Sequence, residues 1–244
     1  MKARPPTVWF FDLDNTLHDA SHAIFPAINL NMNAFIAQIL GDGNTAADPA
    51  TVDAARLAYL KRYGATLLGM VKHHAVRPED FLSAAHRFDD LRSMIRAERG
   101  LARLLDRLPG RKILLTNAPR RYSHDVMRHL GLHRHFGKHI AIESMRVHGK
   151  LQPKPSRQLL RKLIAIERTP AHRCVLVEDT VANLKSGKSL GMRTAWVTQY
   201  LGATPYLQQA AGTPALRNLT KRPAYVDVKV KSIRQLPEHL KRLR

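Results

Sequence analysis

The chain has 244 residues, of which 44% are apolar, enough for one full hydrophobic core and a smaller second unit. No stretch approaches the roughly 18 consecutive apolar residues of a membrane span, and the first residues do not form a secretory signal pattern. We therefore expect a soluble, cytoplasmic protein with no membrane partner. Forty Lys and Arg against nineteen Asp and Glu give a formal charge of +21, which favours anionic ligands without selecting one.

Apolar runs of strand length alternate with segments of helical spacing along most of the chain, as they do around a parallel sheet. Strands are predicted over residues 7–11, 112–116, 174–177 and 193–197, with weaker ones over 139–142 and 224–230; helices are predicted over 122–130, 156–166, 181–190 and 232–243. Gly131 and Gly191 follow two of these helices, where a left-handed residue is expected. A loop containing Pro205 and Pro214 precedes the last strand. The fold class is α/β, with a doubly wound, Rossmann-like parallel sheet.

Residues 20–96 differ from the rest of the chain, because they are rich in Ala, Leu, His and Arg and show little β-branched alternation. Only the turn at residues 41–44 and the Arg77-Pro78 pair interrupt the helical spacing. This composition predicts a small, all-helical domain inserted after the first strand. The expected boundaries are residues 1–19 and 97–244 for the α/β core domain and 20–96 for the helical domain.

Polar residues follow three of the predicted strands, and in an open parallel sheet those strand ends gather ligands. The pair Asp12 and Asp14 follows the first strand, Thr116-Asn117 the second, and Glu178-Asp179 the run at 174–177, while Lys154 lies between two prolines in a loop. Singly, each has an ordinary interpretation as a helix cap, a turn or an exposed loop. Together they form a set suited to phosphoryl transfer.

The chemistry assigns a role to each residue. Asp12 is the candidate nucleophile, forming an aspartyl-phosphate, and Asp14 the candidate general acid and base. Mg²⁺ is expected on Asp12, Asp179 and the main-chain carbonyl of Asp14, because oxygen ligands suit a hard cation. Thr116, Asn117 and Lys154 are expected to bind the phosphate, and Glu178 to support the metal ligands from behind.

These motifs resemble those of haloacid dehalogenase superfamily phosphatases over most of residues 7–199. The resemblance implies that the helical insertion is a cap over the active site. A narrower resemblance, to the pyrimidine 5′-nucleotidase-like branch, rests on residues 14–17, 63–70 and 115–118 and on His86. It implies a nucleoside 5′-monophosphate as substrate, with Tyr63 and His86 as candidate substrate contacts from the cap. His18 stands where that branch usually has Tyr, and we expect this change to alter the mouth of the site.

Several alternatives stay open. Dehalogenase chemistry is disfavoured because it needs no acid for the leaving group, whereas Asp14 supplies one. The motifs alone do not exclude a phosphomutase, and the substrate could instead be phosphoglycolate or a sugar phosphate. A hypothesis of another class makes the chain a basic nucleic-acid-associated protein with a vestigial site, although no helix-turn-helix or aromatic RNA-reading signature accompanies the charge.

Overall fold

The structure, a computed structural model of the chain, describes residues 6–201 and 221–243. It divides into two compact units. The helical insert comprises His22–Met94, and the core unit comprises the described residues up to Ser21 and from Ile95 onward. The loop predicted around Pro205 and Pro214 lies outside the described residues.

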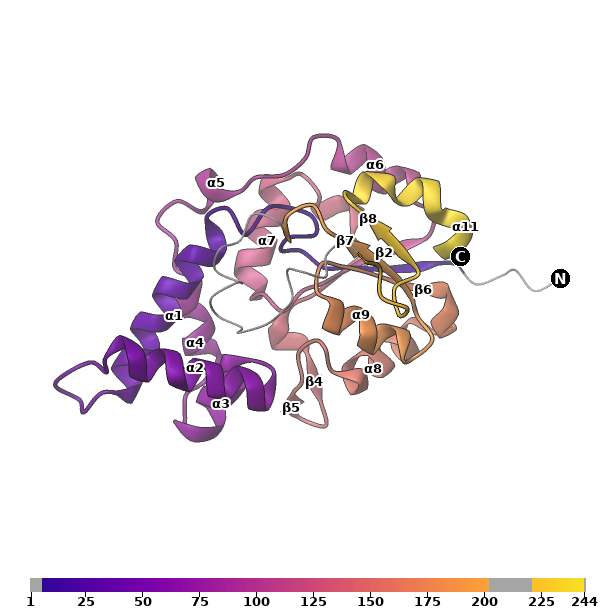
Figure 1. Cartoon of the computed structure of the whole chain (residues 1–244). Coiled ribbons are helices and arrows are strands. Elements are labelled where there is room, and N and C mark those ends of the chain that lie inside the picture. Colours follow the sequence, from indigo (N-terminus) through magenta and orange to yellow (C-terminus); the bar gives the residue numbers. More distant parts are fainter. Residues whose placement is uncertain (1–5, 202–220, 244) are drawn as a thin grey trace. The chain divides into compact units, whose positions relative to one another are not determined.

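The core unit is built on a six-stranded parallel sheet in the order β3-β2-β1-β6-β7-β8 (Figure 1). Its strands are β1 (Val8–Phe11), β2 (Arg111–Leu115), β3 (Lys138–Ile140), β6 (Cys174–Glu178), β7 (Arg193–Val197) and β8 (Val228–Val230). Its α-helices are α6 (Leu101–Arg107), α7 (Arg120–His129), α8 (Arg157–Glu167), α9 (Val181–Lys188) and α11 (Leu240–Leu243), with 3₁₀ helices at His133–His135, Ile142–Ser144, Ala171–Arg173 and Ile233–His239. The predicted doubly wound α/β fold is confirmed.

Strand β1 lies at the centre of the sheet, and its sequence explains why. All four of its residues are buried, as expected for a parallel strand covered on both faces. Val8 and Phe10 pack on one side with Leu159 and Leu163 of α8, and Trp9 stacks on Phe11 with ring centroids 6.1 Å apart. This packing fixes the strand whose end carries Asp12.

Local capping signals set the helix ends much as predicted. The Ser156 side chain accepts a hydrogen bond from the Leu159 N–H at the start of α8. Gly131 and Gly191 have φ angles of 68° and 85°, so both adopt the expected left-handed conformation. Cys174 is fully buried, and this burial raises the pKa of its thiol to about 11, which disfavours the reactive thiolate at neutral pH.

Two local predictions were wrong, and one hairpin was not predicted. The strand predicted over 224–230 is confined to Val228–Val230. Before it, the Val226 N–H donates to the Pro223 carbonyl in a turn, and the Asp227 side chain accepts a hydrogen bond from the Thr194 N–H. The terminal helix predicted over 232–243 is mostly a 3₁₀ helix containing Pro237, which has no N–H for a regular helical bond. The hairpin of β4 (Arg146–Val147) and β5 (Lys150–Leu151) was missed, although its two-residue turn has the left-handed residues that such hairpins need.

Every element assigned in the helical insert is a helix. These helices are α1 (Ile24–Leu40), α2 (Pro49–Tyr63), α3 (Thr66–His73), α4 (Pro78–Ala85) and α5 (Leu91–Met94). The predicted breaks are confirmed, since Gly41 ends α1 and Pro78 is the first residue of α4. Phe35 and Phe81 meet edge to face, with ring centroids 5.6 Å apart. Within residues 6–201 and 221–243, no helix has both the length and the apolar character needed to cross a bilayer.

We predict that Gly69→Ala destabilises the insert. Alanine ordinarily favours a helix interior, but a Cβ at Gly69 would lie 2.1 Å from Cγ of Tyr59, so the packing of α3 against α2 must shift. The expected cost is about 1–3 kcal/mol, measured by urea denaturation. In a Tyr59→Ala background the same substitution should cost much less, and an equal cost in both backgrounds would show that the close approach to Tyr59 is unimportant.

Candidate active site

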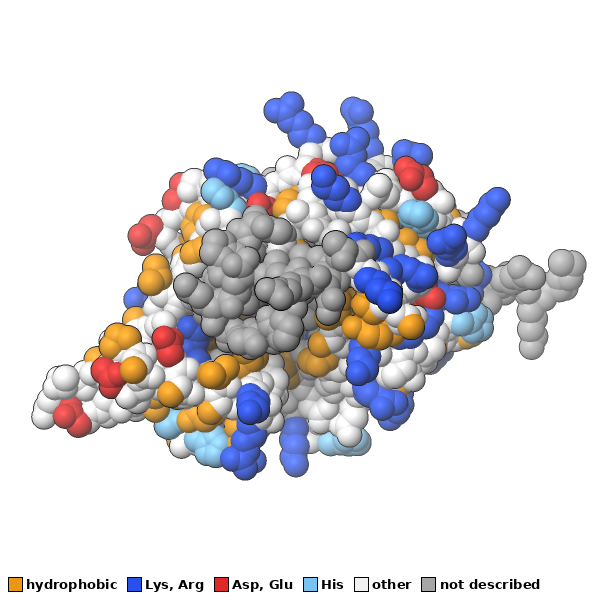
Figure 2. Space-filling view, viewed as in Figure 1, with side chains coloured by type: hydrophobic (Ala, Val, Ile, Leu, Met, Phe, Trp, Pro, Cys, Tyr) orange, Lys and Arg blue, Asp and Glu red, His pale blue; other side chains and the backbone are white. Residues whose placement is uncertain are grey.

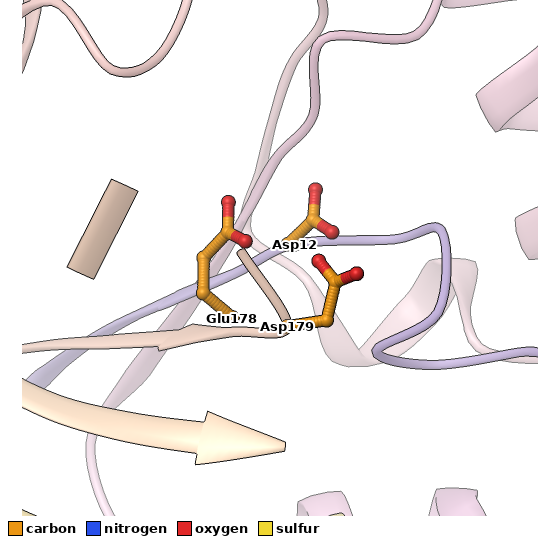
Figure 3. A group of neighbouring side chains, drawn as sticks. All are labelled: Asp12, Glu178 and Asp179. Atoms are coloured by element: carbon orange, nitrogen blue, oxygen red, sulfur yellow. The ribbon is translucent and has the colours of Figure 1, made fainter. Parts of the chain in front are cut away.

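The candidate site lies where β1 and β6 end side by side, at the point where the chain order of the sheet reverses. After β1 the sheet continues through β2 and β3 on one side, and through β6, β7 and β8 on the other. Such a switch point leaves a crevice at the carboxyl ends of the strands. Asp12 follows β1, and Glu178 and Asp179 stand at the end of β6, so their three carboxylates gather in one place (Figure 3). One oxygen from each lies within 4.8 Å of the others.

Lys154 joins two of these carboxylates. Its buried Nζ donates to Oδ1 of Asp12 at 2.7 Å and to Oε1 of Glu178 at 2.5 Å. Burial alone would lower the pKa of Lys154, but the two carboxylates outweigh burial and raise it, so the side chain is a cation at neutral pH. This position beside Asp12 suits the expected contact of Lys154 with a phosphate, which stays a prediction.

Asn117 fixes the loop that carries Lys154. Its Nδ2 donates to the main-chain carbonyl of Lys154, and its Oδ1 accepts from the Lys154 N–H, both at 2.9 Å. The side-chain amide therefore bonds to protein on both sides. Its predicted role on the phosphate stays a prediction, and the contacts assign it a second task, which is to position Lys154.

The charges of this cluster do not balance. Three carboxylates face one ammonium, and burial, together with the charge of Glu178, raises the pKa of Asp12 to about 7 although Lys154 opposes the shift. Burial also raises the pKa of Asp179, and the charges of Glu178 and Asp12 add to that effect. A divalent cation would remove this excess of negative charge, and an all-oxygen donor set suits Mg²⁺. The residues present therefore fit the expected metal.

Glu178 is the most fully supported of the three carboxylates. Its Oε1 accepts from Lys154 and from Nδ2 of Asn183, and its Oε2 accepts from the Thr180 N–H at 2.9 Å. Three donors hold it in place, which favours the predicted supporting role, although it lies within the cluster itself.

Thr116 lies at the end of β2 with its side chain buried. Its Oγ1 accepts the Ala118 N–H at 3.0 Å. Because a hydroxyl can accept and donate at once, the Thr116 O–H can still donate to another group. This arrangement suits the predicted contact with a phosphate oxygen.

The side chain of Asp14 is not one of the three clustered carboxylates. Its Oδ1 accepts a hydrogen bond from the Tyr122 hydroxyl at 2.6 Å and lies 2.8 Å from Nε2 of His18. Asn15 makes this turn at a left-handed φ of 58°, and its amide bonds to Ser21 on both sides. The expected metal contact of Asp14 through its main-chain carbonyl stays a prediction.

His18 contradicts one expectation. We expected it to alter the mouth of the site, but its side chain is fully buried and faces Asp14.

Tyr122, on α7, was not predicted as a residue of the site. Burial and the charge of Asp14 raise the pKa of Tyr122 well above its ordinary value, so it stays a neutral donor. The available signal was its position one turn into the helix that follows Thr116 and Asn117.

The two residues predicted to contact substrate from the insert have partners within it. The Tyr63 hydroxyl lies 2.6 Å from Nε2 of His73, and the cations of Lys72 and Arg62 lie 5.2 and 5.5 Å from its ring centroid. His86 ends α4, with Nδ1 3.0 Å from the Leu82 carbonyl. Their contacts with substrate stay predictions.

Solved structures with the same fold cover nearly the whole chain. A haloacid dehalogenase superfamily phosphatase from Thermococcus onnurineus matches with a TM-score of 0.61 at 15% identity, covering 96% of this chain and 97% of its own. CbbY from Rhodobacter sphaeroides, solved in complex with phosphate, gives a TM-score of 0.60 at 18% identity, with 95% and 96% coverage. The L-2-haloacid dehalogenase from Xanthobacter autotrophicus gives 0.53 at 15% identity, with 96% and 98% coverage. At these identities the likeness shows a shared fold.

The family model of haloacid dehalogenase-like hydrolases matches residues 7–191, a segment that contains Asp12, Asp14, Thr116, Lys154 and Asp179. This match spans well over half of the sequence and includes the whole insert. The chain therefore belongs to the haloacid dehalogenase-like hydrolase family.

Proposed function

We propose that the protein is a Mg²⁺-dependent phosphomonoesterase that acts through an aspartyl-phosphate, with a pyrimidine nucleoside 5′-monophosphate as its substrate. The observation that carries the proposal is the different surroundings of the two carboxylates after β1. Asp12 meets the Lys154 ammonium within the acidic cluster, whereas Oδ1 of Asp14 meets Tyr122 and His18. These surroundings support Asp12 as the group that attacks phosphorus and Asp14 as the group that moves a proton.

The proposed reaction has two displacements. An oxygen of Asp12 forms a bond to phosphorus as the ester P–O bond breaks, and Asp14 gives its proton to the leaving alkoxide. Water then attacks the aspartyl-phosphate, its proton returns to Asp14, and the bond between Asp12 and phosphorus breaks to release phosphate. Lys154 and Thr116 hold phosphate oxygens during both steps. Asp14 is the acid that a dehalogenase does not need.

Asp12, Asp179 and the main-chain carbonyl of Asp14 are the proposed metal ligands. When bound, Mg²⁺ would neutralise charge on the transferring phosphoryl group. Glu178 accepts three hydrogen bonds, and through them it holds the Lys154 side chain and the start of α9 beside this site.

The distribution of charge supports an anionic substrate. The insert, His22–Met94, contains seven Lys or Arg and seven Asp or Glu, so the whole formal charge of +21 belongs to the rest of the chain, which includes the candidate site. On the face seen in Figure 2, Lys and Arg side chains are more numerous than Asp and Glu side chains. Such a field raises the rate at which anions reach a site.

A nucleoside as the leaving group has a separate argument. Tyr63 presents a partly exposed ring with two cations beside it, Lys72 and Arg62, and an aromatic ring of this kind is a surface on which a base can stack. A small phosphate such as phosphoglycolate would make no use of that ring. We therefore rank nucleotides above small sugar and glycolate phosphates as substrates.

We predict Mg²⁺-dependent phosphate release, with the highest kcat/KM for UMP or CMP among pyrimidine and purine 5′-monophosphates, phosphoglycolate and hexose phosphates. Asp12→Asn should lower this release at least about 10³-fold, because an amide cannot form the acyl phosphate. Asp125→Asn, an exposed change on α7, is the matched control. A preference for a small phosphate would keep the chemistry and reject the nucleotide, whereas full activity of Asp12→Asn would reject the covalent route.

We also predict that Mg²⁺ stabilises the protein more at pH 8 than at pH 6. The pKa of Asp12 is about 7 in the metal-free fold and about 4 in an unfolded chain. The fold therefore holds a proton that the unfolded chain releases, and metal-free stability falls as the pH rises from about 4 through 7. At pH 8 Asp12 is already ionised, so Mg²⁺ displaces no proton from it, whereas at pH 6 Mg²⁺ must displace one. The measurement is the rise in Tm when Mg²⁺ replaces EDTA, and an equal rise at both pH values would contradict the assignment.

A further inference from the structure

We propose that Tyr122 and His18 are positioning residues that hold the Asp14 carboxyl group so that its transferable proton is carried on Oδ2. This inference rests on the proposed function, because it deepens the role of Asp14 as the acid for the leaving group. It adds two residues that act through Asp14 and do not touch the substrate.

The geometry places two partners on the same oxygen. The Tyr122 hydroxyl is 2.6 Å from Oδ1 of Asp14, and Nε2 of His18 is 2.8 Å from that same atom. Tyr122 is 108 residues away in sequence and comes from α7, whereas His18 lies four residues after Asp14 in the same loop. The oxygen is thus held from two independent elements.

Both partners act as donors. The Tyr122 phenol is buried and neutral, and its O–H points to Oδ1. The Nδ1 atom of His18 is buried and has no hydrogen-bond partner among residues 6–201 and 221–243. A hydrogen on Nδ1 would be a buried donor with no acceptor, so the favoured tautomer carries its hydrogen on Nε2, which faces Asp14.

Two donors on Oδ1 determine where a protonated Asp14 keeps its proton. An oxygen that already accepts two hydrogen bonds has no lone pair left for a proton, so the acid form is protonated on Oδ2. Rotation of the carboxyl group by half a turn would exchange the two oxygens and break both hydrogen bonds. The pair therefore selects one orientation of the acid, and orientation of a reacting group lowers the barrier without any new contact to substrate.

A purely structural role predicts something different. If Tyr122 and His18 only filled space, their loss would lower the amount or the stability of folded enzyme, and every substrate would suffer equally. If they set the acid, the loss depends on the leaving group. A poor leaving group such as an alkoxide needs the proton, whereas 4-nitrophenolate leaves without one.

The test compares Tyr122→Phe with wild type on two substrates, the best alkyl phosphate ester found for the enzyme and 4-nitrophenyl phosphate. The parameter is kcat/KM, because it reports the steps through release of the first alcohol and excludes hydrolysis of the aspartyl-phosphate. We expect a fall of about tenfold or more for the alkyl ester, because the lost hydrogen bond is one to the carboxylate that forms as Asp14 gives up its proton. For the aryl ester we expect a fall of less than about twofold. Tyr225→Phe removes a phenol elsewhere in the core unit and should change neither value.

His18 gives an independent comparison. His18→Leu should repeat the selective loss, and His18→Gln, whose amide nitrogen can replace Nε2 as a donor, should recover part of it. Equal losses on both substrates, or no loss, would overturn the positioning role while the proposed phosphatase stands. A wild-type protein that releases phosphate from neither substrate would instead overturn the proposed function, and the role of Tyr122 and His18 with it.

Discussion

The buried ammonium of Lys154 is the interaction on which the rest of the site depends. It lies between Asp12 and Glu178, at 2.7 and 2.5 Å, and so joins the end of β1 to the end of β6. Without it, the carboxylates of Asp12 and Glu178 would lose the cation that bonds to both of them. Even with it the charges do not balance, and burial together with the charge of Glu178 raises the pKa of Asp12. A divalent cation would balance the two remaining negative charges, which is what the proposed phosphoryl transfer requires.

Residues with no proposed role in the reaction hold this cluster in place. The apolar side chains of β1 fix the strand from both faces, and the sheet order makes β6 its neighbour. Asn117 fixes the main chain of Lys154, and Asn183 and the Thr180 N–H fix Glu178. In the loop after β1, hydrogen bonds between Asn15 and Ser21 hold the turn that contains Asp14. Two carboxylates separated by one residue therefore meet unlike surroundings, and unlike surroundings are what separate a nucleophile from an acid.

The sequence predicted what depends on local pattern. An apolar run followed by polar residues identifies a strand end, so Asp12, Thr116 and Asp179 could be found one strand at a time. It could not predict the contact between Tyr122 and Asp14, because the packing of α7 creates that contact across 108 residues. The short strand β8 was overestimated for a similar reason, since the Asp227 side chain replaces main-chain pairing there. His18 was placed at a mouth because sequence shows residue type and not burial.

The most direct test of the central claim is to trap the covalent intermediate. The enzyme is mixed with Mg²⁺ and its best phosphate ester, quenched in acid within the first turnover, and digested so that mass spectrometry locates any phosphoryl group. The account predicts a phosphoryl group on Asp12, absent from Asp12→Asn. Rapid phosphate release with no phosphoryl group on Asp12, or with one on another residue, would contradict it.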